Sequence, residues 1–321
     1  MSEVSSGQPL TIRHILSPTD LSEASAPATQ LAVALAGWYG AHVTGLFVLN
    51  PLVFAFPEPA SIIAASIGES SQDLKTDESA LAHLRQEVSN RFAGAEAARV
   101  TLDVLVEVGQ PVTQILACAS RLPADLIVVG THGAGGFEHL IVGSVAEQVL
   151  RRASCPVLTV PPRAHVSSPM LVRRVLCAVD KSDSARAALA SACSLAQHST
   201  AALTLVHVLE WPWEEPPAPK FDELPAAQAV ALSEYRRYRE HTASQWLDSL
   251  VPTPIAASTR LSSRVVHGRP YRGILEVAAH EDSDLIVMGV GDGRVADRAL
   301  FGSTANQVVR GAACPVLTVR R

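Results

Sequence analysis

One glycine-rich segment of the sequence has the residue types and spacing of a phosphate-binding loop. It reads GTHGAGGFEHLIVGS from Gly130 to Ser144, which fits the pattern G-2x-G-9x-G-S. Gly130 and Gly133 let the backbone turn tightly and approach a ligand without a Cβ in the way. Gly143 precedes a predicted helix, whose free N–H groups at Ser144 and Val145 would point at an anion. The Ser144 hydroxyl adds a further donor. This spacing favours phosphate binding over glycines that only make turns.

A second segment, GVGDGRVADRALFGS from Gly289 to Ser303, has the same length and one informative difference. Asp292 stands where the first segment has a glycine, and a carboxylate at that position would repel phosphate. Arg294 and Arg298 could offset this charge, although the simpler interpretation is that both arginines are solvated. The sequence therefore predicts weaker or different binding by the second segment.

Several other chemistries lack their sequence patterns. The chain has no GxxxxGK[ST] motif, so it is not a P-loop NTPase, and no GxGxxG follows the first strand, so a dinucleotide dehydrogenase is excluded. His132 and His139 lie in the first loop, but no G-x-S-x-G motif supplies a nucleophile for them. We therefore expect no catalytic residue and no protein-bound metal.

The two glycine-rich segments belong to the two halves of an internal repeat. DLIVVG at 125–130 returns as DLIVMG at 284–289, and CPVLTV at 155–160 returns at 314–319. Because the order and spacing of these pairs are kept across half the chain, they indicate a duplicated domain. We predict domains at 1–165 and 166–321, joined by a linker rich in proline and serine at 161–169.

Strand and helix signals alternate in each half. The first half has predicted strands at 13–19, 42–49, 101–108, 125–129 and 156–160, and helices at 22–38, 72–92 and 111–121 and from Gly143 onward. The second half has strands at 174–179, 203–209, 258–267, 284–288 and 315–319, with a long helix at 226–250. This rhythm predicts two doubly wound α/β domains, each with a parallel sheet that binds ligands beyond the carboxyl ends of its strands.

The glycine-rich loop, Asp20 at the end of the first strand and the closing CPVLTV strand together resemble the universal stress protein family. The resemblance covers nearly the whole chain, as two family domains. It implies flavodoxin-like or Rossmann-like sandwiches related by a pseudo-two-fold axis. It also implies ATP as the ligand, with Mg²⁺ held through the phosphates.

The resemblance assigns roles to individual residues. Pro18, Thr19 and Asp20 would line the adenosine side, although Asp20 is equally explained as a helix-capping carboxylate beside Ser22. Val48 would present backbone groups to the adenine. The ribose and phosphates would be held by Gly130, Gly133, Gly143, Ser144 and Val145. The matching positions in the second half are Asp180, Val208, Gly289, Gly302, Ser303 and Thr304, whereas Val179 replaces Thr19.

Composition and charge bear on location and partners. The formal charge is -5 and no long basic run is present, which argues against nucleic acid or an anionic membrane as a partner. No signal peptide or long apolar segment is present, so we expect a cytoplasmic protein. The five cysteines form no CxxC pair, so we expect buried, reduced thiols.

The last strand of each half is a candidate contact between the two domains. These strands run from Pro156 to Val160 and from Pro315 to Val319, and short apolar edge strands are seldom left open. In the homodimers of the resembling family, this strand commonly makes the contact. We therefore expect the two strands to pair within one chain, and a homodimer through other surfaces stays an open alternative.

Three functions are consistent with the sequence. The first is an ATP-binding protein of the stress response, in which nucleotide occupancy biases loop conformation. The second is a slow ATP hydrolase, for which no residue is convincingly placed as a water-orienting base. The third is a scaffold or small-ligand binder that works without nucleotide, which Asp292 favours for the second half.

Overall fold

A computed structural model of the chain describes residues 11–50, 78–132, 143–164, 172–210, 225–251, 259–291 and 302–320. The described residues form two compact units, 11–164 and 172–320. Five positions discussed above lie outside the described residues: Gly133, His139, Asp292, Arg294 and Arg298.

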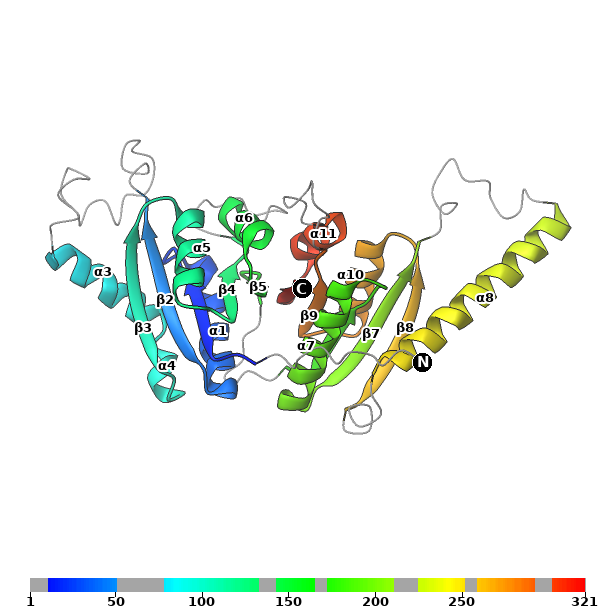
Figure 1. Ribbon diagram of the computed structural model, residues 1–321, viewed down its shortest axis with the longest axis horizontal. Coiled ribbons are helices and arrows are strands. Elements are labelled where there is room, and N and C mark those ends of the chain that lie inside the picture. Colours follow the sequence, from blue (N-terminus) through cyan, green and yellow to red (C-terminus); the bar gives the residue numbers. More distant parts are fainter. Residues whose placement is uncertain are drawn as a thin grey trace. The chain divides into compact units, whose positions relative to one another are not determined.

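The first unit is a parallel sheet covered by helices (Figure 1). Its strands are β1 (His14–Pro18), β2 (His42–Leu49), β3 (Leu102–Val108), β4 (Leu126–Gly130) and β5 (Val157–Val160), in the order β3-β2-β1-β4-β5. Every neighbouring pair among them is parallel. Its helices are the 3-10 helix η1 (Glu23–Ser25), α1 (Ala26–Tyr39), α3 (Glu78–Arg91), α4 (Gly94–Ala97), α5 (Pro111–Arg121) and α6 (Ser144–Arg152).

The second unit repeats this architecture. Its strands are β6 (Arg174–Ala178), β7 (Ala202–Leu209), β8 (Leu261–His267), β9 (Leu285–Gly289) and β10 (Val316–Val319), in the order β10-β9-β6-β7-β8. These neighbouring strands are also parallel. Its helices are α7 (Asp183–Ser199), α8 (Ala226–Leu250), α10 (Pro270–His280) and α11 (Ser303–Gly311). The predicted fold class, two doubly wound α/β domains in tandem, is confirmed.

A carboxylate fixes the central strands to each other in the same way in both units. Asp125, just before β4, accepts hydrogen bonds at Oδ2 from the backbone N–H groups of Arg13 (2.8 Å) and His14 (3.0 Å). Asp284, just before β9, accepts equivalent bonds from Arg173 (2.8 Å) and Arg174 (2.9 Å). Hydrogen bonds to an ionised acceptor are among the stronger ones in proteins. The repeated DLIV segment therefore sets the register of its strand as well as filling the core.

The predicted helix at 22–38 is wrong at its start. The chain after β1 first forms the 3-10 helix η1, and α1 begins only at Ala26. Pro27 lies in the first turn of α1, where its fixed φ suits the helix and its missing N–H removes no hydrogen bond. The short helix α4 was also not predicted.

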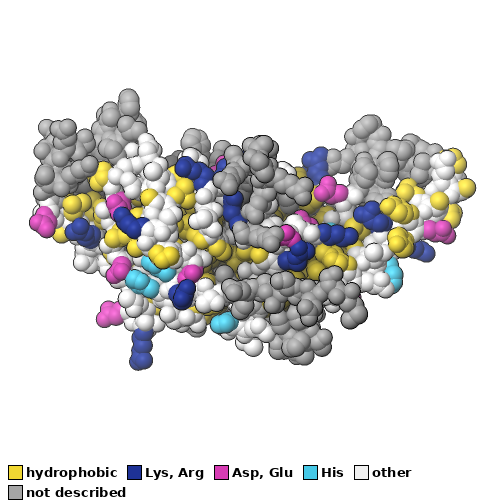
Figure 2. Space-filling model, in the orientation of Figure 1, with side chains coloured by type: hydrophobic (Ala, Val, Ile, Leu, Met, Phe, Trp, Pro, Cys, Tyr) yellow, Lys and Arg dark blue, Asp and Glu magenta, His cyan; other side chains and the backbone are white. Residues whose placement is uncertain are grey.

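Three elements have the predicted bounds, whereas the other strands differ from the prediction by one to three residues at an end. The bounds of β2, α5 and α8 agree with the prediction residue for residue. The helix α8 exposes the large apolar residues Val230, Tyr235 and Tyr238. Figure 2 shows apolar side chains along this helix. Among the described residues, no helix combines the length and apolar character needed to cross a membrane. The pairing of the last strand of one half with that of the other stays a prediction.

The strand order creates a switch point in each unit. From β1 the chain continues to β2 and β3 on one side, and it returns to the other side of β1 with β4. In the second unit, β6 and β9 meet in the same way. In doubly wound sheets, ligands bind beyond the carboxyl ends of the strands at such a point. The fold therefore directs attention to the residues that follow β1 and β4, and β6 and β9.

Candidate functional site

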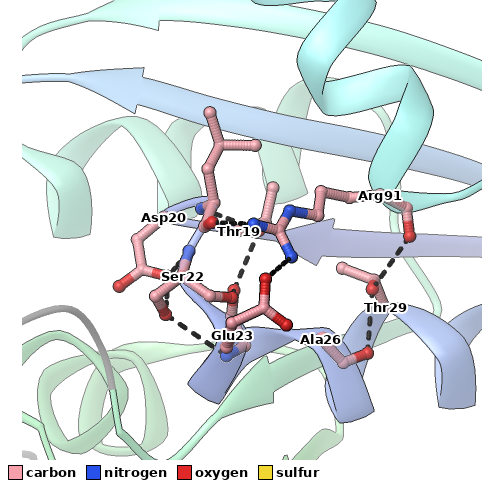
Figure 3. A network of polar contacts seen from close by, with 9 residues as sticks. Thr19, Asp20, Ser22, Glu23, Ala26, Thr29 and Arg91 are labelled. Atoms are coloured by element: carbon pink, nitrogen blue, oxygen red, sulfur yellow. Dashed lines mark hydrogen bonds and ion pairs between the residues drawn. The ribbon is translucent and has the colours of Figure 1, made fainter. Parts of the chain in front are cut away.

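The loop after β1 is held by a buried threonine (Figure 3). The backbone N–H of Thr19 donates to the Leu46 carbonyl at 2.9 Å, which continues the pairing of β1 with β2. The Thr19 hydroxyl lies 3.1 Å from the Ser25 hydroxyl, and its Oγ1 accepts a hydrogen bond from the Leu21 N–H at 3.1 Å. Thr19 therefore joins the end of the strand to the start of the helix that follows.

Asp20 is exposed at the carboxyl end of β1 and orients a capping serine. Its Oδ1 accepts from the Ser22 N–H (3.1 Å) and from the Ser22 hydroxyl (2.6 Å). Ser22 is the N-cap of η1, since its Oγ accepts from the Ser25 N–H at 3.3 Å. The capping side chain is thus Ser22, and the carboxylate of Asp20 stays at the edge where the fold expects a ligand.

Between these two residues, Leu21 has a backbone conformation that is uncommon for leucine. Its φ is 63°, in the left-handed region. The Leu21 carbonyl accepts a hydrogen bond from Arg91 Nη2, and Arg91 Nη1 pairs with Glu23 Oε1 at 2.7 Å. The carbonyl of Arg91, the last residue of α3, accepts from the Thr29 hydroxyl at 3.2 Å. Figure 3 shows this arginine reaching from α3 to the loop. Sequence reasoning missed Arg91.

The loop after β4 brings its two described ends together. The Thr131 N–H donates to the Val160 carbonyl at 2.9 Å, which extends the pairing of β4 with β5. The Gly143 N–H donates to the Thr131 carbonyl at 2.7 Å, although twelve positions separate the two residues in the sequence. The start of α6 therefore lies beside the end of β4, as a phosphate loop requires.

The N-terminus of α6 has the features of an anion site. The helix begins at Ser144, whose side chain is exposed, and no described side chain makes a capping hydrogen bond there. The first N–H groups of a helix have no intrahelical partner, and the helix dipole favours negative charge at this end. Val145 follows Ser144 in this first turn, as the sequence predicts.

The glycines of this loop differ from ordinary packing glycines. Among the described residues, a Cβ added to Gly143 would meet the Thr131 carbonyl oxygen at 3.4 Å and no other atom within 4 Å, and the φ of Gly143 is -56°. A Cβ on Gly130 would lie 3.4 Å from Ser25 Cα and from the His132 carbonyl oxygen. Both distances are ordinary van der Waals contacts. The described residues therefore give no steric reason for glycine at these positions.

The remaining predicted residues of the first unit lie at the same edge. Pro18 ends β1 and is paired with Leu46, and the half-buried Val48 lies two positions further along β2. His132 follows Thr131, and its Nδ1 lies 2.9 Å from the Thr131 hydroxyl. Because Thr131 is only 2% exposed, this hydroxyl is not presented to a substrate as a nucleophile.

The corresponding edge of the second unit repeats only part of this arrangement. Asp180 Oδ1 accepts from the Ser182 N–H at 2.9 Å, and Ser182 caps α7. Val179 is buried and has no hydroxyl to join the strand to the helix. The other predicted positions are Val208, half-buried in β7, and Gly302, Ser303 and Thr304 at the start of α11.

Gly289, at the end of β9, has a structural reason to be glycine. A Cβ at this position would lie 2.5 Å from the Ala185 backbone nitrogen and 2.5 Å from the Ser184 carbonyl carbon. Both atoms belong to the first turn of α7, so the helix packs directly on the glycine. Around Gly302, by contrast, an added Cβ would meet no atom of the described residues within 4 Å.

The loop after β6 is supported by an aromatic side chain instead of an arginine. Trp246 of α8 packs against His207 with 5.0 Å between ring centroids, and the Lys181 ammonium lies 5.9 Å from the Trp246 ring. The Nδ1 of His207 lies 2.8 Å from the Val179 carbonyl oxygen, so in the tautomer that carries this proton it donates to that oxygen. The two loops are therefore held by different chemistry.

All five cysteines are free, as expected for reduced thiols. Cys118, Cys177 and Cys193 are buried, whereas Cys155 and Cys314 are half-buried, which corrects the expectation for those two. Burial raises the pKa of Cys155 to about 11 and that of Cys314 to about 12. The thiolate is the reactive form, so neither thiol is activated at neutral pH.

Comparison with known proteins agrees with two similar domains in tandem. The model of the universal stress protein family matches residues 11–161 and again residues 171–320. A universal stress protein of Methanocaldococcus jannaschii is 32% identical over 151 residues, which cover 46% of this chain and 81% of that protein. A universal stress protein of Mycolicibacterium smegmatis is 26% identical over 320 residues, which cover 95% of this chain and 96% of that protein.

The solved structures show the same fold over the full length. The crystal structure of a universal stress protein from Archaeoglobus fulgidus has a TM-score of 0.62 and 24% sequence identity to this chain. The alignment covers 96% of this chain and 98% of the other. At this level of identity the likeness establishes the tandem α/β architecture alone.

Proposed function

Because the chain belongs to the universal stress protein family, we propose that it is an ATP-binding stress-response protein whose tight nucleotide site lies at the carboxyl edge of the first unit. The observation that carries the proposal is the environment of Gly143. This glycine lies at the start of α6, beside the end of β4, where no described side chain caps the helix and the described residues leave room for a Cβ.

The described residues fit a nucleotide in two parts. The N–H groups of Ser144 and Val145 and the Ser144 hydroxyl would hold phosphate oxygens, and Mg²⁺ would be bound through those phosphates. Pro18, Thr19 and Asp20 would line the adenosine, and the backbone of Val48 would face the adenine. The pairing of β1 with β2 and with β4 brings both parts to one edge of the sheet. Bound nucleotide would then join the loops after β1 and β4, and its presence would bias their conformation.

At the corresponding edge of the second unit, the residues support a different function. Gly289 is explained by the packing of α7, and Val179 lacks the hydroxyl of Thr19. We propose that this unit binds ATP more weakly or takes part in regulation without nucleotide.

The experiment is native mass spectrometry of the purified protein, followed by calorimetric titration with MgATP. We expect a retained nucleotide, or one tight binding event per chain. Absence of both retained nucleotide and binding heat at millimolar ATP would contradict the proposal. A phosphate-release assay then distinguishes binding from slow hydrolysis, since steady release at the rate of a true ATPase would favour the hydrolase.

A further inference from the structure

We propose that Arg91 is a positioning residue of the nucleotide site, which holds the loop after β1 in the conformation that presents Thr19 and Asp20 to the adenosine. The proposal rests on the ATP site proposed above and assigns to it a residue from a distant helix. Arg91 touches the loop and not the nucleotide, so its effect is transmitted through Leu21.

Three atoms of Arg91 bind the loop after β1, the 3-10 helix η1 and the first turn of α1. Nη2 donates to the Leu21 carbonyl, Nη1 pairs with Glu23 at 2.7 Å, and the backbone carbonyl accepts from Thr29 at 3.2 Å. The Glu23 side chain is 88% exposed, and exposed ion pairs contribute little. The Arg91 side chain is only 28% exposed, and its bond to the Leu21 carbonyl is charge-assisted. The hydrogen bond from Arg91 to the Leu21 carbonyl therefore contributes more to holding the loop than the ion pair with Glu23 does.

That contact holds a strained residue in place. A leucine at a φ of 63° is unfavourable unless its surroundings fix it, and such conformations cluster at functional sites. The Leu21 N–H is bound to Thr19 Oγ1 and its carbonyl to Arg91, so both adjoining peptide groups are fixed. Asp20 lies between Thr19 and Leu21. If the Leu21 carbonyl were released, the backbone would relax and both Thr19 and Asp20 would change direction.

The described residues of the second unit show no equivalent contact. The last residue of α8 is Leu250, which has no guanidinium, and Lys181, the counterpart of Leu21, is not among the described residues with positive φ. The strained loop and the arginine thus occur together in the unit with the complete phosphate loop.

The first test needs no nucleotide. In Arg91→Ala, amide hydrogen exchange at Leu21 and Ser22, measured by NMR, should become about tenfold faster, because their hydrogen bonds depend on the fixed loop. Exchange at Ser182, the same position in the second unit, should stay unchanged and serves as an internal control. Unchanged exchange at Leu21 and Ser22 overturns the proposal whether or not the chain binds ATP.

The second test separates positioning from a loss of stability. Calorimetry should show about tenfold weaker binding of both ATP and adenosine to Arg91→Ala, with tripolyphosphate binding unchanged, because only the adenosine side loses its alignment. Arg85→Ala, which removes an exposed arginine from the same helix, should bind all three ligands as the wild type does. Equal losses for tripolyphosphate and adenosine would indicate a merely structural role and contradict the proposal.

A double substitution makes the mechanism specific. Asparagine adopts left-handed backbone conformations more readily than leucine. Leu21→Asn combined with Arg91→Ala should therefore recover most of the lost adenosine affinity, whereas Glu23→Gln alone should change it less than about twofold. If the double variant binds no better than Arg91→Ala, the strain at Leu21 is not what Arg91 controls, and the proposal is overturned.

Discussion

The loops after β1 and β6 occupy the same place in two copies of one fold, and different contacts hold them. In the first copy, a buried threonine hydroxyl, a left-handed leucine and an arginine from α3 fix the loop. In the second copy, a valine replaces the threonine, and Trp246 packs beside the loop. The strand order is the same in the two copies, whereas α8 has 25 residues and its counterpart α3 has 14. The two copies thus share the sheet and differ in the helix and the contacts that support the loop at its edge.

The largest effect should follow substitution of Gly143. Gly143→Val should lower ATP affinity by about 100-fold, because the added side chain would occupy the space of the phosphates at the start of α6. The free energy of unfolding should change little, since among the described residues a Cβ meets the Thr131 carbonyl oxygen alone, at 3.4 Å. Calorimetry and urea unfolding provide the two measurements.

Gly302→Val is the matched control in the other copy, where the surrounding space is also open. Gly302→Val should leave the ATP affinity of the tight site in the first unit unchanged. Unchanged ATP affinity in Gly143→Val would show that the proposed phosphate position is wrong.

The second prediction concerns the free energy of unfolding, for which the larger loss is expected in the second copy. Gly289→Ala should destabilise the second unit by about 2 kcal/mol, because its Cβ would lie 2.5 Å from backbone atoms of α7. Gly130→Ala should cost less than about 1 kcal/mol, since its nearest contacts are at 3.4 Å. Chemical denaturation of both variants measures the difference. If both variants lost the same free energy of unfolding, the proposed difference between Gly289, which α7 packing requires, and Gly130, which packing does not require, would be wrong.

A third experiment addresses the charge in the second glycine-rich segment. Titration of the wild type should resolve one tight ATP site per chain, and Asp292→Gly should strengthen the weaker site about tenfold by removing a negative charge near phosphate. Asp292→Asn, which keeps the size but not the charge, is the control. Two equal sites in the wild type would contradict the predicted asymmetry.

The smallest effect concerns two cysteines at matching positions. Because burial raises the pKa of Cys155 to about 11 and of Cys314 to about 12, the folded state favours the neutral thiols. Their contribution to stability is complete below the unfolded pKa of about 8.5 and is lost as pH rises towards 11 and 12. The double variant Cys155→Ala, Cys314→Ala should show a shallower fall in the free energy of unfolding above pH 9. An unchanged slope would mean that other groups cause the alkaline loss.

The sequence predicted the elements well where local signals define them. Pro111 marks the start of α5, and the alternation of apolar residues marks β2, so both have their predicted bounds. The contact of Arg91 with the loop after β1 could not be predicted from such local signals. Leu21 and Arg91 are 70 positions apart, and nothing near Arg91 in the sequence indicates its target. Likewise, Gly130 and Gly289 follow nearly identical strands, and only the distance to the next helix distinguishes them.

The packing of α7 on Gly289 also affects how tandem chains should be screened for nucleotide binding. A glycine that a helix requires will persist in a domain that never meets a nucleotide, because its replacement costs folding. A search that scores every glycine of the motif equally would therefore count such a domain as a binder. Glycines with room around the backbone among the described residues, such as Gly143 and Gly302, carry information on a ligand that Gly289 does not.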